Sequence, residues 1–91
     1  MACVMTRVQV GDYDKWKAMF DSDPPGARKS AKGHRVYRLV DNPNEVQIVV
    51  EFETTDEATV ARDKLLDSGV LERVQVTVPP TLVIEEEALV Y

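Results

Sequence analysis

The sequence predicts a single α+β domain whose elements follow the order β-α-β-β-α-β. Three observations support this fold class. An alternating apolar and polar segment, 2–10, leads directly into a helix pattern that begins at about Tyr13. Two further alternating segments, 34–40 and 45–53, flank a turn, and a second helix pattern with its own cap begins near Thr54. This order builds a four-stranded antiparallel sheet with both helices on one face, the ferredoxin-like arrangement.

Length, composition and charge restrict the classes of function. Residues 1–91 are expected to form one domain, because 44% hydrophobic and 30% charged residues are typical of a folded globular protein. The net charge of −5 argues against a nucleic-acid partner, since neutralising phosphates requires a basic surface. No window is apolar enough to span a membrane and no signal-peptide pattern is present, so we expect a cytoplasmic protein without a membrane partner. Cys3 is the single cysteine, which excludes an internal disulfide.

The first helix is expected to begin at Tyr13, with the side chain of Asp12 as its N-cap. Large apolar residues recur at helical spacing after this cap, so they form one stripe that faces the sheet. The prolines at 24–25 are expected to end the helix, and the polar stretch 26–33 to connect it to the next strand with a short helical turn. The stripe consists of Tyr13, Trp16, Met19 and Phe20.

The second and third strands are expected to form a hairpin, because residues 41–44 favour a tight turn. A loop of two or four residues is the simplest solution, and either even length pairs odd positions of one strand with even positions of the other. We therefore expect Arg35, Tyr37 and Leu39 to share a face with Val46, Ile48, Val50 and Phe52. The opposite, more polar face would carry His34, Val36 and Arg38 with Gln47, Val49, Glu51 and Glu53.

The second helix is expected to begin at residues 54–57, which have the spacing of a capping box. Gly69 is placed to end this helix in a left-handed conformation. Residues 70–78 fit either a helical turn or a strand, and we expect a short helix followed by a loop. The prolines at 79–80 are expected to separate this segment from a last strand over 81–86. The buried stripe of the second helix would consist of Ala58, Ala61, Leu65 and Leu66.

Four segments resemble small cyclase-like or antibiotic biosynthesis monooxygenase-like proteins of the dimeric α+β barrel superfamily. They are residues 10–16 (VGDYDKW), 36–38 (VYR), 41–46 (DNPNEV) and 51–53 (EFE). The resemblance implies a homodimer in which two sheets pack across a twofold axis, with residues 85–91 reaching toward the partner. It also implies a pocket between each sheet and its helices or adjoining loops. Members include cofactor-free monooxygenases, haem-degrading enzymes and decyclising or isomerising enzymes, so the fold alone does not transfer an activity.

Dimerisation is also expected from the size of the chain. A domain of this length buries only about 60–65% of the surface that its unfolded form exposes. A sheet covered by helices on one face would leave Met5, Val36 and Val49 exposed in a monomer. We therefore expect the face opposite the helices to be buried against a second copy of the chain.

His34 is the single histidine, so any proposal of general acid–base catalysis starts with it. The alternative interpretation is a surface histidine that hydrogen-bonds a carboxylate, with Glu51 and Glu53 as the nearest candidates. One histidine with scattered carboxylates lacks the clustered ligand spacing of zinc or non-haem iron sites. We therefore expect no metal and no cofactor.

Polar side chains on the predicted strands form a second group of candidates, expected on the sheet face opposite the helices. A guanidinium offers a planar, bidentate fork for a carboxylate or enolate oxygen, so the arginines of this group could bind an anionic ligand. The alternative is structural ion pairs with Glu51 and Glu53 across the dimer. The group consists of Arg7, Gln9, Arg38 and Gln47.

Aromatic side chains suggest what a pocket could hold. They suit a planar, polyketide-like substrate, and they equally suit an ordinary helix-on-sheet core. Two classes of function therefore stay open: a cofactor-independent monooxygenase or cyclase acting on an aromatic or polyketide-like molecule, and a noncatalytic dimer that binds a small ligand or serves as a stress-related accessory protein. The predicted catalytic residues are His34 and Arg38. The predicted pocket residues are Trp16, Tyr37, Arg7 and Gln47.

Basic residues concentrate between the first helix and the third strand, although the protein is acidic overall. This local reversal of charge could bind an anionic ligand or partner. The alternative is a solvated loop that offsets the acidic surface. The residues are Arg28, Lys29, Lys32, Arg35 and Arg38.

Overall fold

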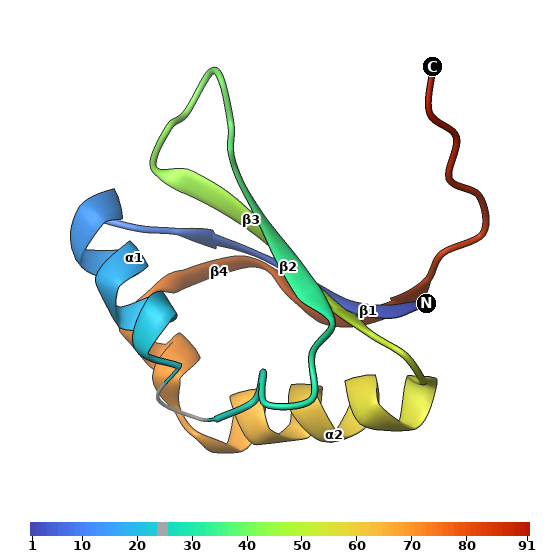
Figure 1. Cartoon of the computed structure of the whole chain (residues 1–91). Helices are drawn as coiled ribbons and strands as arrows, with labels where there is room; N and C mark the ends of the chain where they lie inside the picture. Colours follow the sequence, from blue (N-terminus) through green and yellow to red (C-terminus); the bar gives the residue numbers. More distant parts are fainter. Residues whose placement is uncertain (24–25) are drawn as a thin grey trace.

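The computed structural model describes residues 1–23 and 26–91, and it confirms the predicted fold class. Four antiparallel strands form one sheet in the order β2-β3-β1-β4, and two α-helices lie on the same side of it (Figure 1). No helix among the described residues is long and apolar enough to cross a membrane. The elements are β1 (Ala2–Gln9), α1 (Tyr13–Ser22), β2 (Gly33–Arg38), β3 (Glu45–Phe52), α2 (Thr55–Asp67), the short 3₁₀ helix η1 (Val70–Arg73) and β4 (Gln75–Ile84).

Both ends of α1 have local causes. The side chain of Asp12 accepts a hydrogen bond from the backbone N–H of Lys15 at 3.2 Å, so the predicted N-cap is confirmed. Asp23 follows the helix in the left-handed region, with φ 46°, and its N–H donates to the carbonyl of Phe20 at 3.0 Å. The helix therefore ends at Ser22, before the prolines predicted to end it, and those prolines lie outside the described residues.

The core lies between the sheet and the helices. Alternate residues of the two central strands point toward the helices, as expected for a strand whose side chains alternate between two faces. Thr6 is the buried polar residue among them, and its hydroxyl donates to the carbonyl of Val78 at 2.7 Å, which satisfies its hydrogen-bonding capacity. The buried apolar residues are Ala2, Val4 and Val8 of β1 and Val46, Ile48, Val50 and Phe52 of β3.

The predicted register of the β2–β3 hairpin is wrong. His34 pairs with Val50 and Val36 pairs with Ile48, so even positions face even positions. The loop spans residues 40–44, an odd number, because Leu39 and Glu45 still form a backbone pair at 3.0 Å. Within the loop, the N–H of Asn42 bonds the carbonyl of Leu39, and its own carbonyl accepts from the N–H of Glu45. These two successive tight turns accommodate the extra residue.

The register error exchanges the two faces of β2. Val36 points toward the helices and packs half-buried against the core, so it is not an exposed residue of the open face as predicted. His34 and Arg38 share the helix side with it. Arg35 and Tyr37 lie instead on the open face, beside the odd-numbered residues of β3.

The segment after α2 is partly as predicted. Gly69 has φ 73°, the left-handed conformation expected, and the short helix η1 follows it. The predicted loop is wrong, because β4 begins at Gln75 and continues through both prolines to Ile84. β4 is an edge strand, so a proline that lacks an N–H leaves no strand partner unpaired on its outer side. A register shift along β1 between Met5 and Val8 accommodates the irregularity. Residues 85–91 form no strand and run away from the sheet (Figure 1).

The first turn of α2 has the predicted N-cap but only half of the predicted capping box, because the Glu57 carboxylate bonds the Thr54 hydroxyl rather than the Thr54 backbone N–H. The hydroxyl of Thr54 accepts a hydrogen bond from the N–H of Glu57 at 3.1 Å, and the Glu57 carboxylate accepts from the same hydroxyl at 3.2 Å. Ala58 and Ala61 are buried as predicted, whereas Leu66 is 50% exposed and does not belong to the buried stripe.

We predict that Thr54→Ala lowers the free energy of unfolding by about 1 kcal/mol, because the first turn of α2 loses its cap. Urea unfolding at fixed protein concentration measures this. Thr59→Ala is the matched control: its hydroxyl bonds only the carbonyl of Thr55 within the helix, at 2.8 Å, so no comparable loss is expected. Equal losses for the two variants would contradict the capping role.

Candidate functional site

The two helices stand at different distances from the sheet. Cα atoms of α2 come within 8 Å of Cα atoms in β1, β3 and β4, which the small side chains of Ala58 and Ala61 permit. No Cα atom of α1 comes within 8 Å of a Cα atom in a described strand. Large side chains fill that wider gap: Trp16 is 8% exposed and stacks on Phe20, with ring centroids 5.1 Å apart. The space left between α1, α2 and the sheet is a cavity.

The cavity is almost entirely apolar. It holds about 90 Å³ of space and opens to solvent at its mouth. Its walls come from the helix-facing side of β1 and β3, from both helices, from the loop after α1, and from η1. The residues that line it are Val4, Thr6, Val8, Trp16, Met19, Phe20, Asp23, Ala27, Arg28, Ile48, Val50, Phe52, Ala61, Leu65, Val70, Leu71 and Val74.

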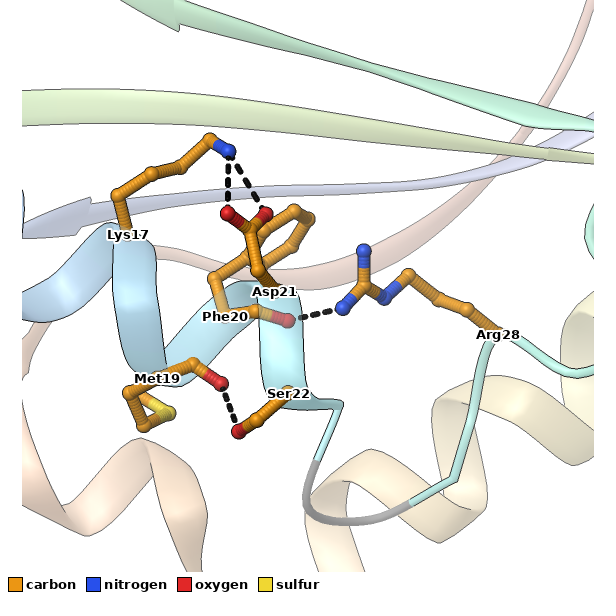
Figure 2. Close-up of polar contacts among 6 residues, drawn as sticks. All are labelled: Lys17, Met19, Phe20, Asp21, Ser22 and Arg28. Atoms are coloured by element: carbon orange, nitrogen blue, oxygen red, sulfur yellow. Dashed lines mark hydrogen bonds and ion pairs between the residues drawn. The ribbon is translucent and has the colours of Figure 1, made fainter.

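Asp23 and Arg28 are the ionisable residues among those lining the cavity. The Arg28 guanidinium donates to the carbonyl of Phe20, lies 3.8 Å above the centroid of its ring, and approaches the Asp23 carboxylate at 3.6 Å (Figure 2 shows the first of these contacts). The backbone N–H of Arg28 also donates to Asp23 at 3.1 Å. Arg28 thus fastens the loop after α1 to the C-terminal end of that helix, where exposed carbonyls favour a cation.

The predicted catalytic residues lie beside the cavity but do not line it. The ring of His34 meets the ring of Phe20 edge-on, with centroids 5.2 Å apart. Arg38 lies 4.0 Å above the ring of Tyr13, and its Nε donates to the carbonyl of Pro43 at 2.8 Å. His34 and Arg38 therefore share one strand and the helix side of the sheet. The predicted contact of His34 with Glu51 or Glu53 is not formed, because the correct register places those carboxylates on the other face.

Three of the four predicted pocket residues lie across the sheet from the cavity. Trp16 alone among them lines it. Tyr37, Arg7 and Gln47 lie on the open face, where Arg7 donates to the Gln47 side chain at 2.6 Å and approaches Glu45 at 3.6 Å. The predicted group of Arg7, Gln9, Arg38 and Gln47 is therefore split, since Arg38 lies on the helix side.

The open face combines polar and apolar side chains. Arg35 pairs with Glu51 at 2.6 Å, whereas the Nε of Arg7 is buried without a hydrogen-bond partner. Cys3 is buried at the end of this face. Burial raises the pKa of the Cys3 thiol, and the carboxylates of Glu51 and Glu85 raise it further, so the thiol stays protonated at neutral pH.

The predicted pocket residues did not include any from the loop after α1 or from η1, although both segments line the cavity. Asp23 and Arg28 meet only because the chain turns back on itself after α1. Val70 and Leu71 enter the cavity wall through the short helix η1. The helix periodicity of the sequence correctly predicted that Trp16 and Phe20 lie on one face of α1. Among the described residues, no group of three or more potential ligands could hold a metal ion.

We predict that Arg28→Ala lowers the free energy of unfolding by about 1–2 kcal/mol, because a half-buried carbonyl bond and a cation–π contact are lost together. Thermal unfolding at fixed concentration measures the loss. Lys17→Ala is the control, because Lys17 lies on α1, the helix to which Arg28 is bonded. The exposed pair of Lys17 with Asp21 at 2.7 Å (Figure 2) contributes less than about 0.5 kcal/mol. A loss for Arg28→Ala no larger than that for Lys17→Ala would contradict the fastening role.

Comparison with known proteins supports the fold. No protein-family model and no curated protein matches the chain. A solved structure named "Putative antibiotic biosynthesis monooxygenase" from Bordetella bronchiseptica matches with a TM-score of 0.68 and 20% identity, covering 97% of each chain. A second structure of that name, from Deinococcus radiodurans, matches with a TM-score of 0.71 and 11% identity, covering 100% of this chain and 98% of that chain. The chain therefore has the fold of antibiotic biosynthesis monooxygenase-like proteins.

Proposed function

We propose that this protein binds an aromatic or polyketide-like small molecule in the cavity between its sheet and helices, and oxidises it as a cofactor-independent monooxygenase. The apolar cavity carries the proposal, because Trp16 and Phe20 offer flat surfaces to a ring system and the apolar walls offer water few hydrogen-bond partners. The names of the two similar structures favour a monooxygenase reaction over a cyclase reaction.

The proposed chemistry uses the electrons of the substrate itself. A ring system with an acidic CH₂ group loses a proton, and the resulting carbanion reduces O₂, so that R₂CH₂ and O₂ give R₂C=O and water. The protein must hold the ring, exclude bulk water and move protons. We retain His34 as the proposed proton acceptor and Arg38 as the residue that stabilises the anion. Both lie on β2 behind the aromatic side chains of α1: His34 is separated from the cavity by Phe20, and Arg38 by Tyr13 and Trp16.

A specific observation favours a second candidate, a noncatalytic ligand-binding protein. Among the described residues that line the cavity, Asp23 and Arg28 are the ionisable groups, and they already contact each other. A cavity whose charged groups are engaged can bind an apolar molecule without any group positioned to react with it. Measuring binding and turnover separately distinguishes the two candidates.

We predict that anthrone, a tricyclic ketone with an acidic CH₂ group, binds the protein and that its oxidation consumes O₂. Leu71→Trp should abolish both binding and oxidation, because it fills the cavity from η1, whereas Leu66→Trp on the exposed side of α2 should change neither. Calorimetry measures binding, and an oxygen electrode measures turnover.

His34→Ala and Arg38→Gln complete this experiment. If these residues act in catalysis, each variant keeps anthrone binding within about twofold and loses turnover about 100-fold or more. Binding without O₂ consumption in the native protein would favour the noncatalytic candidate. Absence of binding, or binding that survives Leu71→Trp, would overturn both candidates.

We further propose that the protein forms a homodimer through the open face of the sheet. Met5 and Val49 are half-buried there and adjacent in the register of β1 and β3. The Nε of Arg7 is withdrawn from water without a partner, and a second copy could supply an acceptor. A face that combines apolar side chains with polar groups of both signs suits a self-complementary, twofold contact.

We predict that Val49→Asp converts the dimer to a monomer, because it places a charge in the centre of this face. Val40→Asp is the control, since Val40 is 95% exposed in the β2–β3 loop. Sedimentation velocity over a range of protein concentrations measures the association. A native protein that stays monomeric throughout, or a Val49→Asp variant that stays dimeric, would exclude this interface.

A further inference from the structure

A second hollow adjoins the apolar cavity. It lies between the loop after α1 and the outer surface of α2, opens to solvent, and holds about 120 Å³. Ala27 and Ala61 line both this hollow and the apolar cavity. Both spaces open to solvent and share these two methyl-sized side chains at their boundary, so one ligand of moderate length could reach from one space to the other over them.

The second hollow is basic, unlike the first. Lys29 contributes to it from the loop, and Lys64 from the last turn of α2. Ser30 adds a hydroxyl that has no hydrogen-bond partner among the described residues. Ammonium groups and a hydroxyl are donors suited to a carboxylate or a phosphate.

These two lysines differ from the other basic residues nearby. Arg28, Lys32 and Arg35 each pair with a carboxylate, that of Asp23, Glu53 and Glu51 respectively. Within the described part of the chain, neither Lys29 nor Lys64 has a carboxylate within 4 Å. In a protein with a net charge of −5, two cations facing one hollow without such a partner form a local site for an external anion.

The loop holds Lys29 in place. Gly26 has φ 63°, and a Cβ atom built on it would lie 3.3 Å from the Cε atom of Lys29. The side chain of Lys29 therefore packs over this left-handed glycine. The contacts of Arg28 with Asp23 and Phe20 anchor the same loop one residue earlier, which places the exposed Lys29 beside α2.

We propose that Lys29, Ser30 and Lys64 bind the anionic group of an amphipathic organic anion whose apolar ring system occupies the adjoining cavity. The inference rests on the proposed function and deepens it by naming the substrate class, an aromatic or polyketide-like compound that carries a carboxylate or phosphate group. The ligand lies across Ala27 and Ala61, with its ring against Trp16 and Phe20 and its charge at the outer surface of α2.

Three naphthalene probes of equal ring size test the proposal: 1-naphthylacetate, 1-naphthyl phosphate and the neutral 2-(1-naphthyl)ethanol. Calorimetry with the full chain measures their affinities. We expect one or both anions to bind about tenfold more tightly than the alcohol, and their order to distinguish a carboxylate site from a phosphate site. The double variant Lys29→Gln with Lys64→Gln should remove this preference and leave the affinity for the alcohol unchanged.

Lys15→Gln is the matched control, because Lys15 is an exposed lysine of α1 that lines neither hollow. It should keep the preference for the anions. Equal binding of the alcohol and both anions, or a preference that survives the double lysine variant, would overturn this inference alone, provided that Leu71→Trp still abolishes binding of the alcohol. Failure of all three probes while anthrone binds would also overturn this inference alone, and failure of the probes and of anthrone would overturn the proposed function together with it.

Discussion

The distance between each helix and the sheet is set by the size of the side chains between them, and the cavity depends on this difference. Ala58 and Ala61 let α2 pack close to the strands. Trp16 and Phe20 hold α1 farther away, because two stacked aromatic rings cannot be compressed. The space that neither helix fills is apolar, since most of the side chains around it come from the sides of strands and helices that face the core.

The C-terminal end of α1 connects this packing to the charge distribution. Arg28 stacks on Phe20 and bonds its carbonyl, so the loop that follows α1 is tied to the aromatic side chain that lines the cavity. The same loop carries Lys29 to the outer side of α2. The apolar cavity and two lysines that have no carboxylate within 4 Å among the described residues are thereby brought next to each other, although the protein as a whole is acidic.

The two faces of the sheet have different environments. The helix side carries the buried core, the cavity and His34, whereas the open face carries Arg7, Tyr37 and Gln47. A ligand in the cavity cannot reach the residues of the open face, because the sheet lies between them. The polar residues of that face are therefore better suited to a second copy of the chain than to the ligand.

The sequence by itself determined the element order, both helix caps and the aromatic stripe of α1, because these depend on residues within one or two turns of each other. Only the tertiary structure decided which face His34, Tyr37 and Arg38 occupy, since one extra residue in the loop 40–44 exchanges the two faces of β2. It also decided that residues 75–78 extend β4, because pairing with β1 outweighs the interruption by proline. The cavity, and the meeting of Arg28 with Phe20 and Asp23, likewise arise from the path of the chain between elements, which no local pattern records.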